Sequence, residues 1–195
     1  MENTKLPITN LVLEGGGVKG IAYVGALEVL DDLAILEKIE NVAGTSAGAI
    51  TACLIALRYS AEDIKKIVFD LDFNSFEDHK NPLRIATKYG LYAGDAFLEW
   101  ISNLIAKKDL DSKATFSDFE KAGCRNLKVF ATDLYTKDLQ EFSAQETPDT
   151  IVAEAVRASM SIPLFFKSWR FSNNVPNDHI YVDGGVLLNF PINTF

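Results

Sequence analysis

The chain has 195 residues, of which 48% are hydrophobic and 24% are charged, a composition typical of one compact globular domain. Its formal net charge of -8 weighs against nucleic acid as a partner, because phosphate binding needs clustered Lys and Arg. No uninterrupted run of about 18 apolar residues is present, so we expect no membrane span. The N-terminus also lacks the basic and apolar segments of a secretory signal.

The two cysteines, Cys53 and Cys124, have neither metal-ligand spacing nor the arrangement of a disulfide framework. Cys53 lies in an apolar run and is expected to be a small core residue. We therefore expect a cytoplasmic protein that is peripheral to membranes when active, with secretion by a signal-independent route left open. The acidic charge removes simple attraction to anionic membranes, so docking on lipid would be hydrophobic, local or delegated to another domain.

Short apolar runs alternate along the chain with helical periodicity, which predicts a layered α/β domain. Strands are expected at residues 11–13, 41–43, 127–131 and 180–182. Helices are expected over residues 20–33, from the 44–48 segment to about residue 58, over 64–71, over 97–104, and from Thr147-Pro148 onward. Asp95 and Ser117 have the pattern of N-caps, the latter with Glu120 completing a capping box.

The organisation predicts one catalytic domain over residues 1–195. Residues 73–94 form the least regular segment, and we expect either a lid over the site or a surface excursion between helices. The chain stops at residues 191–195, shortly after a strong motif, so we expect a C-terminal truncation or one domain of a longer protein.

The first chemical motif is Gly44-Thr45-Ser46-Ala47-Gly48, a G-x-S-x-G match between a predicted strand and an apolar helix. A serine on such a tight turn needs small neighbours, and Gly44 and Gly48 remove the side chains that would clash. The hydroxyl of Ser46 would then stand at the N-terminus of the helix, where the helix dipole favours developing negative charge. The alternative is an idle serine at a helix entry.

The second motif is the glycine-rich loop Gly15-Gly16-Gly17-Val18-Lys19-Gly20, which follows a predicted strand. Its bare backbone amides can donate to a phosphate or to the oxyanion of a tetrahedral intermediate. It also satisfies the dinucleotide fingerprint G-x-G-x-x-G, for which Glu37 or Glu40 stands near the required acidic position. A nucleotide-binding role therefore stays open on this loop alone. Lys19 could steady a phosphate head group, or it could be an ordinary exposed loop lysine.

The third motif, Asp183-Gly184-Gly185, follows a predicted strand. A carboxylate at a strand end followed by two glycines can approach a serine closely and act as its general base. Taken singly, the motif is more typical of a β-turn, and only together with the other two motifs does it favour a general base.

A Ser-His-Asp triad is the rival mechanism. His79 lies in a polar turn and is expected to be solvated, whereas Ser46, Asp133 and His179 follow the chain order of the α/β-hydrolases. His179 precedes the last predicted strand, and Asp183 follows it. Because active groups of parallel α/β sheets collect at the carboxyl ends of strands, we prefer a Ser46–Asp183 dyad.

Together these motifs resemble the patatin-like phospholipases. The resemblance rests on the glycine-rich loop, the Ser46 turn, residues 158–166 and the Asp183-Gly184-Gly185 motif, with the strand end at residues 131–134 adding to it. It spans almost the whole chain, and the four features are specific only jointly.

The resemblance implies a three-layer α/β/α fold with a mostly parallel central sheet, and release of fatty acids from phospholipids or other acyl lipids. It implies Ser46 as nucleophile, Asp183 as base and the amides of Gly15, Gly16 and Gly17 as oxyanion hole. Motif support would come from Lys19, Gly20, Gly44, Gly48, Gly184 and Gly185. No metal or organic cofactor is needed. The implied partners are the lipid and a transient membrane or micelle surface, with an activating protein left open.

Overall fold

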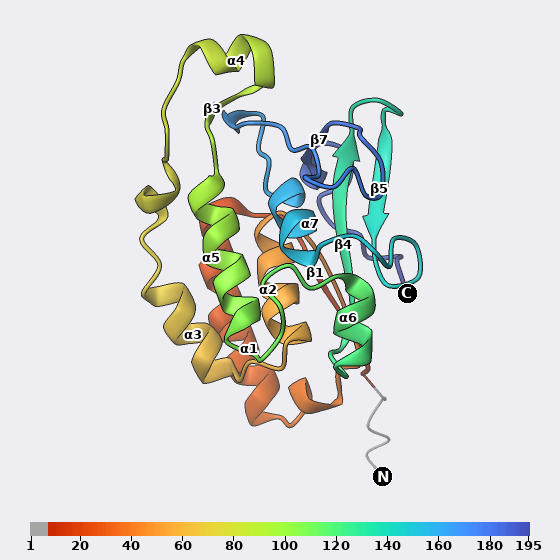
Figure 1. The fold of residues 1–195 in the computed structure, drawn as a ribbon. Coiled ribbons are helices and arrows are strands. Elements are labelled where there is room, and N and C mark those ends of the chain that lie inside the picture. Colours follow the sequence, from red (N-terminus) through yellow and green to blue (C-terminus); the bar gives the residue numbers. More distant parts are fainter. Residues whose placement is uncertain (1–7) are drawn as a thin grey trace.

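A computed structural model describes residues 8–195 (Figure 1). Within these residues the central sheet has five strands, namely β1 (Asn10–Leu13), β2 (Asn41–Thr45), β4 (Asn126–Asp133), β5 (Asp138–Phe142) and β7 (Tyr181–Asp183). Strands β1, β2 and β4 run parallel in that spatial order, whereas β5 and β7 pair antiparallel with β4. The α/β class and the mostly parallel central sheet expected from the sequence are confirmed.

The helices of the described residues are α1 (Ala22–Asp32), α2 (Ala47–Ala56), α3 (Ala61–Phe69), α4 (Leu83–Lys88), α5 (Asp95–Ala106), α6 (Phe116–Lys121) and α7 (Val152–Ser159). Short 3-10 turns occur at η1 (Gly17–Ile21), η2 (Leu36–Lys38), η3 (Phe73–Phe76) and η4 (Gly184–Val186). A separate two-stranded parallel sheet consists of β3 (Gly90–Tyr92) and β6 (Leu164–Phe166). Helix α2 packs on β1, β2 and β4, α7 packs on β4 and β7, and α5 packs on α7.

Strand β2 and helix α2 form the centre of the core. Helix α2 is apolar on all sides, and Leu54 and Ile55 within it are fully buried, as expected of a helix enclosed by other elements. Val42 and Ala43 of β2 are equally inaccessible, which fits a strand flanked by two parallel neighbours. Ser46 is the single residue between this strand and this helix, so the best-packed part of the molecule fixes its position.

Two helix starts differ from the sequence prediction. Helix α6 is capped by Thr115, not Ser117, and Thr115 forms its capping box with Asp118. The helix begins two residues earlier than predicted because a start at Thr115 places Phe116 and Phe119 in the core, where both are buried. The helix expected from Thr147-Pro148 begins only at Val152. The carbonyls of Pro148 and Thr150 instead accept the Ser117 and Phe116 amides, so this stretch serves as a turn that holds the start of α6.

Helix α5 likewise begins differently from the prediction. Asp95 is its first helical residue, and the N-cap is Gly94 at a φ of +71°. The carboxylate that satisfies this helix start comes from Asp78, which accepts the Gly94 and Ala96 amides at 2.6 and 2.8 Å. Asp95 pairs with Lys167 at 2.8 Å instead.

The irregular segment between α3 and α5 combines a buried part with a projecting part. Phe76 is buried, and its ring contacts Phe97 and Trp100 of α5 with centroids 5.2 and 5.6 Å apart. Further along the chain, α4 extends beyond the main body at the end where β3 and the start of α5 lie (Figure 1). The segment therefore both contributes to the core and forms a surface excursion.

Candidate active site

Ser46 occupies a sharp turn between β2 and α2. Its φ of 54° and ψ of -125° are unfavourable for a residue with a side chain, so packing around it must hold the turn. A Cβ on Gly44 would lie 2.3 Å from the Gly48 carbonyl oxygen, and a Cβ on Gly48 would lie 2.4 Å from the Leu13 carbonyl oxygen. Both glycines are therefore required for the close approach of strand and helix, as the motif predicts.

The backbone of Ser46 is held by Ser159, a residue of the 158–166 stretch to which the sequence analysis assigns no individual role. The Ser46 amide donates to Ser159 Oγ at 2.9 Å, and Ser159 Oγ donates to the Phe130 carbonyl at 2.6 Å. All three residues are buried, so this chain of hydrogen bonds ties the turn to α7 and β4.

The structure brings Ser46 and Asp183 into direct contact. Ser46 Oγ donates to Asp183 Oδ2 at 2.6 Å, and both residues are buried, with 4% and 6% of their surfaces exposed. The second carboxylate oxygen accepts the Gly185 amide at 2.7 Å, which fixes the carboxylate plane. The Asp183 amide donates to the Ser161 carbonyl, so the backbone is held as well. A hydroxyl and a fixed carboxylate in this arrangement can act as nucleophile and base.

The direction of the strand that carries Asp183 differs from the sequence prediction. The sequence predicts Asp183 at the carboxyl end of a parallel strand, but β7 is antiparallel to β4 and pairs Asp183 with Ala131. Phe130, the preceding residue of β4, pairs with Thr45, the residue before Ser46. The register of β7 on β4 therefore places Asp183 next to Ser46, although β7 is antiparallel. The predicted reason for their proximity, that both follow the carboxyl ends of parallel strands, was wrong.

Burial raises the pKa of the Asp183 carboxyl above its ordinary value, and the hydrogen bonds from Ser46 and Gly185 oppose that rise only in part. A carboxylate with a raised pKa is a stronger base than one in water, which suits proton abstraction from a hydroxyl.

The glycine-rich loop lies beside this pair, but its amides are not equivalent. The Gly15 amide donates to the Asn189 carbonyl at 2.9 Å and is therefore committed within the protein, which corrects its expected role as an oxyanion donor. The Gly16 and Gly17 amides make no hydrogen bond to another described residue. Gly17 has a φ of +54°, which a side chain would disfavour.

The supporting residues of the loop have separate places. Lys19 is exposed, and its amide donates to the Gly16 carbonyl in the turn. A Cβ on Gly20 would lie 3.0 Å from the Cβ of Ala47, so Gly20 allows the loop to pack against the start of α2. A Cβ on Gly184 would lie 2.4 Å from the Phe130 carbonyl oxygen, which explains the first glycine after Asp183.

Two cavities meet at this site. A cavity of about 310 Å³ is lined by Ser46, Asp183, the three glycines 15–17 and neighbouring residues. A second cavity of about 390 Å³ has mostly apolar walls, which include Ile50, Val68, Leu71, Trp100 and Phe165. Gly17 and Ile162 line both cavities. Met160, whose sulfur is 3.6 Å from Ser46 Oγ, also lines the apolar one. Ser46 therefore lies at the junction of a polar and an apolar space.

The residues of the rival triad are divided between two places. His179 Nδ1 contacts Asp133 Oδ2 at 2.7 Å, and the Tyr135 ring stacks on the imidazole at a centroid distance of 4.5 Å. Ser46 Oγ donates instead to Asp183. The pairing of His179 lowers the pKa of Asp133 and, with the Tyr135 amide, outweighs the opposing effect of burial. His79 is exposed, as expected.

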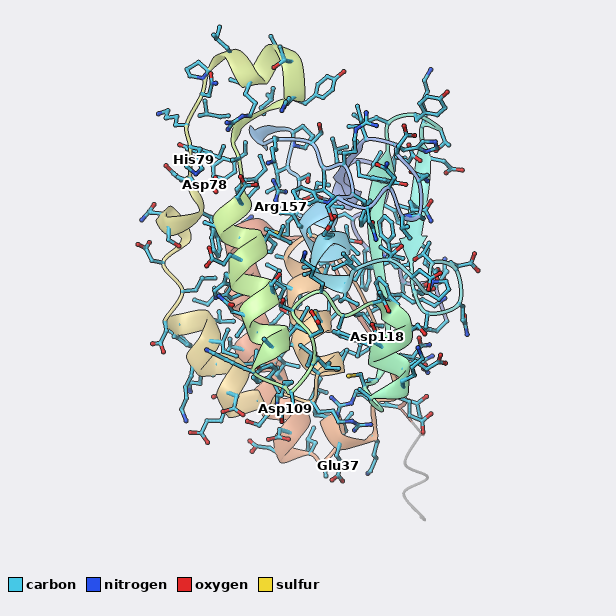
Figure 2. All side chains as sticks on the ribbon, viewed as in Figure 1. Glu37, Asp78, His79, Asp109, Asp118 and Arg157 are labelled. Carbon is cyan, nitrogen blue, oxygen red and sulfur yellow. The ribbon has the colours of Figure 1, made fainter. Side chains whose placement is uncertain are left out.

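The two acidic residues that could contact the ribose of a nucleotide lie at the end of the sheet opposite to the glycine-rich loop. Glu37 and Glu40 precede β2, whereas the glycine-rich loop follows β1, and the two strands are parallel. Figure 2 shows Glu37 at the end of the molecule opposite to Asp78 and His79. A ribose held at the glycine-rich loop would therefore not meet either carboxylate.

Two residues missed by the sequence argument support the site. Asn189 lines the polar cavity, and its side-chain amide donates to the Gly15 carbonyl at 3.0 Å. Arg157, fully buried in α7 and labelled in Figure 2, donates to the Ser161 hydroxyl and to the Gly94 and Ala93 carbonyls. Burial lowers the pKa of Arg157 to about 10. Neither residue belongs to a recognisable spacing, so only the proximity to known motifs could have suggested them.

Comparisons with known proteins show the family of this chain. The family model described as patatin-like phospholipase matches residues 11–195. An uncharacterized protein of Acanthamoeba polyphaga mimivirus is 35% identical, over 96% of this chain and 61% of its own length. YqhO of Bacillus subtilis, also uncharacterized, is 37% identical over 93% and 64%. A probable lipid hydrolase of Invertebrate iridescent virus 6 is 28% identical over 93% and 61%.

Solved structures agree on the fold. VipD from Legionella pneumophila superposes with a TM-score of 0.71 at 22% identity, covering 95% of this chain and 47% of VipD. ExoU of Pseudomonas aeruginosa, in its complex with SpcU, gives a TM-score of 0.59 at 26% identity, covering 80% and 39%.

The chain spans 61 to 64% of the length of the three curated relatives described above. Within residues 8–195, none of the helices combines the length and apolar character that crossing a membrane requires. The family model accounts for nearly every residue, from the first strand through the glycine-rich loop, the Ser46 turn and Asp183 to the last residue. The chain therefore belongs to the patatin-like phospholipase family.

Proposed function

We propose that this chain is the catalytic part of a lipid acyl hydrolase that releases fatty acids from phospholipids or other acyl lipids, with Ser46 as nucleophile and Asp183 as base. The observation that carries the proposal is the 2.6 Å hydrogen bond from Ser46 Oγ to Asp183 Oδ2, beside an apolar cavity. The iridescent-virus relative, named a probable lipid hydrolase, supports the same class of reaction.

In the first half of the reaction, Asp183 Oδ2 accepts the proton of Ser46 as Oγ attacks the acyl carbonyl carbon. Negative charge develops on the carbonyl oxygen, and the Gly16 and Gly17 amides are the donors left to receive it. The C–O bond of the ester then breaks, and the leaving alcohol or lysolipid takes the proton from Asp183. Loss of one oxyanion donor costs on the order of 3 kcal/mol of transition-state stabilisation, so this loop is a main source of rate.

In the second half, water attacks the acyl-enzyme and gives its proton to Asp183. The bond between the acyl carbon and Ser46 Oγ breaks, the proton returns to Oγ, and the fatty acid leaves. Every proton moves between Ser46, Asp183, water and the leaving group, so neither a metal nor an organic cofactor enters the cycle.

The apolar cavity accounts for a fatty-acyl substrate. Its volume of about 390 Å³ is that of roughly a dozen groups the size of a water molecule or a methylene. Each methylene that leaves water for such a site contributes about 0.8 kcal/mol. We therefore expect medium-length acyl chains to be preferred over acetyl esters.

Hydrolysis of a fluorogenic medium-chain ester tests the proposal. Wild-type protein should release the fluorophore, Ser46→Ala should lose at least about a thousandfold in rate, and Ser102→Ala on α5 should keep the wild-type rate. Equal rates for wild type and Ser46→Ala would contradict the proposed mechanism.

A further inference from the structure

The surface around α4 exposes several large apolar side chains. Leu83, Ile85 and Tyr89 are 79%, 38% and 51% exposed, and Leu164 and Phe165 of β6 are 67% and 38% exposed. The two groups are adjacent, because the Leu164 amide donates to the Tyr89 carbonyl at 2.7 Å. A cluster of apolar side chains of this kind marks a surface that is covered in function. We call residues 80–89 together with Leu164 and Phe165 the α4 projection.

The α4 projection is basic in an otherwise acidic chain. Residues 79–94 contain Lys80, Arg84 and Lys88 and neither Asp nor Glu, although the chain as a whole carries a net charge of -8. Lys80 and Lys88 are exposed, whereas Arg84 donates to the His79 and Leu91 carbonyls and so holds the loop. Apolar side chains flanked by free lysines are the composition of segments that lie in an anionic lipid interface.

The α4 projection is continuous with the candidate active site. It extends from the end of the molecule at which β4 ends, the end that carries Ser46 and Asp183 (Figure 1). Phe165 both belongs to the projection and lines the apolar cavity, and its ring contacts Tyr92 of β3 with centroids 4.9 Å apart. A lipid surface in contact with the α4 projection would therefore also contact Phe165, a wall residue of the apolar cavity beside Ser46.

We propose that the α4 projection docks this protein on anionic phospholipid bilayers, with Leu83 and its apolar neighbours entering the interface and Lys80 and Lys88 contacting the lipid head groups. The biological purpose of this docking rests on the proposed lipid hydrolysis, but the binding itself needs no catalysis. A bilayer fits this surface better than a folded protein, because flexible lysine stems and exposed apolar side chains adapt to a fluid interface without a matching shape.

Sedimentation with vesicles tests the docking. Ser46→Ala protein, which cannot consume the lipid, is mixed with vesicles of phosphatidylcholine alone or of phosphatidylcholine and phosphatidylglycerol in equal parts. We expect binding to the mixed vesicles, weaker binding to the neutral ones, and loss of the difference at high salt. Equal binding to both vesicles, or to neither, would overturn the proposal.

Matched variants assign the binding to this surface. Leu83→Asp should weaken binding to mixed vesicles at least about tenfold, whereas Leu33→Asp, an equally drastic change at an exposed site beside α1, should not. Lys80→Glu/Lys88→Glu should weaken it by about fivefold or more for each lysine. Lys107→Glu/Lys113→Glu, which alters net charge equally, should bind like the parent. Equal losses of vesicle binding in Leu83→Asp and Leu33→Asp, or in the two double lysine variants, would overturn the assignment to this surface. So would the finding that this surface binds a folded protein and not vesicles.

The outcome separates docking from catalysis. Leu83→Asp on the Ser46-containing protein should hydrolyse a soluble monomeric ester at the wild-type rate and melt at the wild-type temperature, while its rate on mixed vesicles falls. If wild type cleaves no ester but binds the mixed vesicles, the hydrolase proposal fails and the docking proposal stands. If it cleaves the soluble ester but binds no vesicle, the reverse holds.

Discussion

Ser46 and Asp183 are 137 positions apart in the sequence and share one hydrogen bond in the structure. Each is held by further contacts of its own, Ser46 through Ser159 and Asp183 through Gly185 and Ser161. The burial that raises the pKa of Asp183 also costs stability, because a buried carboxylate is poorly solvated.

This cost gives a prediction at the scale of one residue. A group whose folded-state pKa is raised contributes stability that is present below its unfolded pKa and lost as pH rises through its folded pKa. Asp183→Asn keeps an oxygen for the Gly185 amide and cannot ionise, so it should lack this loss. We expect its melting temperature to exceed that of wild type at neutral pH and to converge with it in acid, while ester hydrolysis is abolished.

Thermal melting of both proteins over a pH series measures this difference. Asp149→Asn, at an exposed position, is the control and should match wild type throughout. A melting temperature difference of the same size at every pH would contradict the role given to the buried carboxyl.

At the residue scale, the sequence predicts the meeting of Ser46 and Asp183 better than it predicts the residues that surround them. The Ser46 turn and the Asp183 motif are local patterns whose glycines have steric reasons that can be read from the chain. Asn189 acts only through a distant partner, so its contact with Gly15 leaves no trace in the sequence. His179 and Asp133 do contact each other, but Ser46 donates its hydrogen bond to Asp183 and not to His179. The order of Ser46, Asp133 and His179 along the chain is the same in either arrangement, so it could not show which one forms.

At the scale of elements, the close packing of α2 on β1 is the feature that sets the Ser46 turn. Gly48 lies within the first turn of α2 and has no room for a side chain beside the Leu13 carbonyl. Gly25, in α1, has open space where its Cβ would be. The same substitution at these two helical positions should therefore have opposite effects.

We expect Gly48→Ala to lower the free energy of unfolding by about 1–3 kcal/mol or more through overpacking, and to disturb the Ser46 turn. Gly25→Ala should raise it by about 0.5–1 kcal/mol, because alanine loses less entropy in a helix. Urea unfolding followed by circular dichroism compares the two variants. A stable and active Gly48→Ala protein would be incompatible with the packing described.

The elements themselves were predicted more reliably than their ends and directions. Apolar runs locate β1, β2, β4 and β7 because burial dictates them. The start of α6 depends on which aromatic residues face the core, and the start of α5 depends on Asp78, a residue far from it in sequence. The antiparallel direction of β7 is set by tertiary pairing over three residues, too few to carry a pattern.

At the scale of the whole molecule, the last residues of the chain return to its first loop. The Gly15 amide and the Asn189 carbonyl form one hydrogen bond, and the Asn189 side chain and the Gly15 carbonyl form a second. The Leu188 carbonyl also accepts from the Thr45 hydroxyl at 3.3 Å. The glycine-rich loop is thus held in place by a segment that follows Asp183, so the candidate site depends on contacts between segments that lie far apart in the sequence.

Asn189→Ala removes the side-chain contact and leaves the backbone one. We expect kcat for a soluble ester to fall by on the order of ten- to a hundredfold, since small displacements of catalytic groups are costly, with KM little changed. The apolar cavity, which is not lined by Asn189, should bind the acyl chain as before. Steady-state kinetics with Asn193→Ala as an exposed control measures this. A rise in KM at constant kcat would show that Asn189 contacts substrate and does not position the loop.

Labelling by a fluorophosphonate probe, read out by peptide mass spectrometry, tests the central claim most directly, because the probe reacts only with an activated serine. The account predicts the phosphonyl group on Ser46 in wild type, its absence in Ser46→Ala and strongly slowed labelling in Asp183→Asn. Labelling of a different serine in a protein that hydrolyses lipid esters, or unchanged labelling of Ser46 in Asp183→Asn, would contradict it.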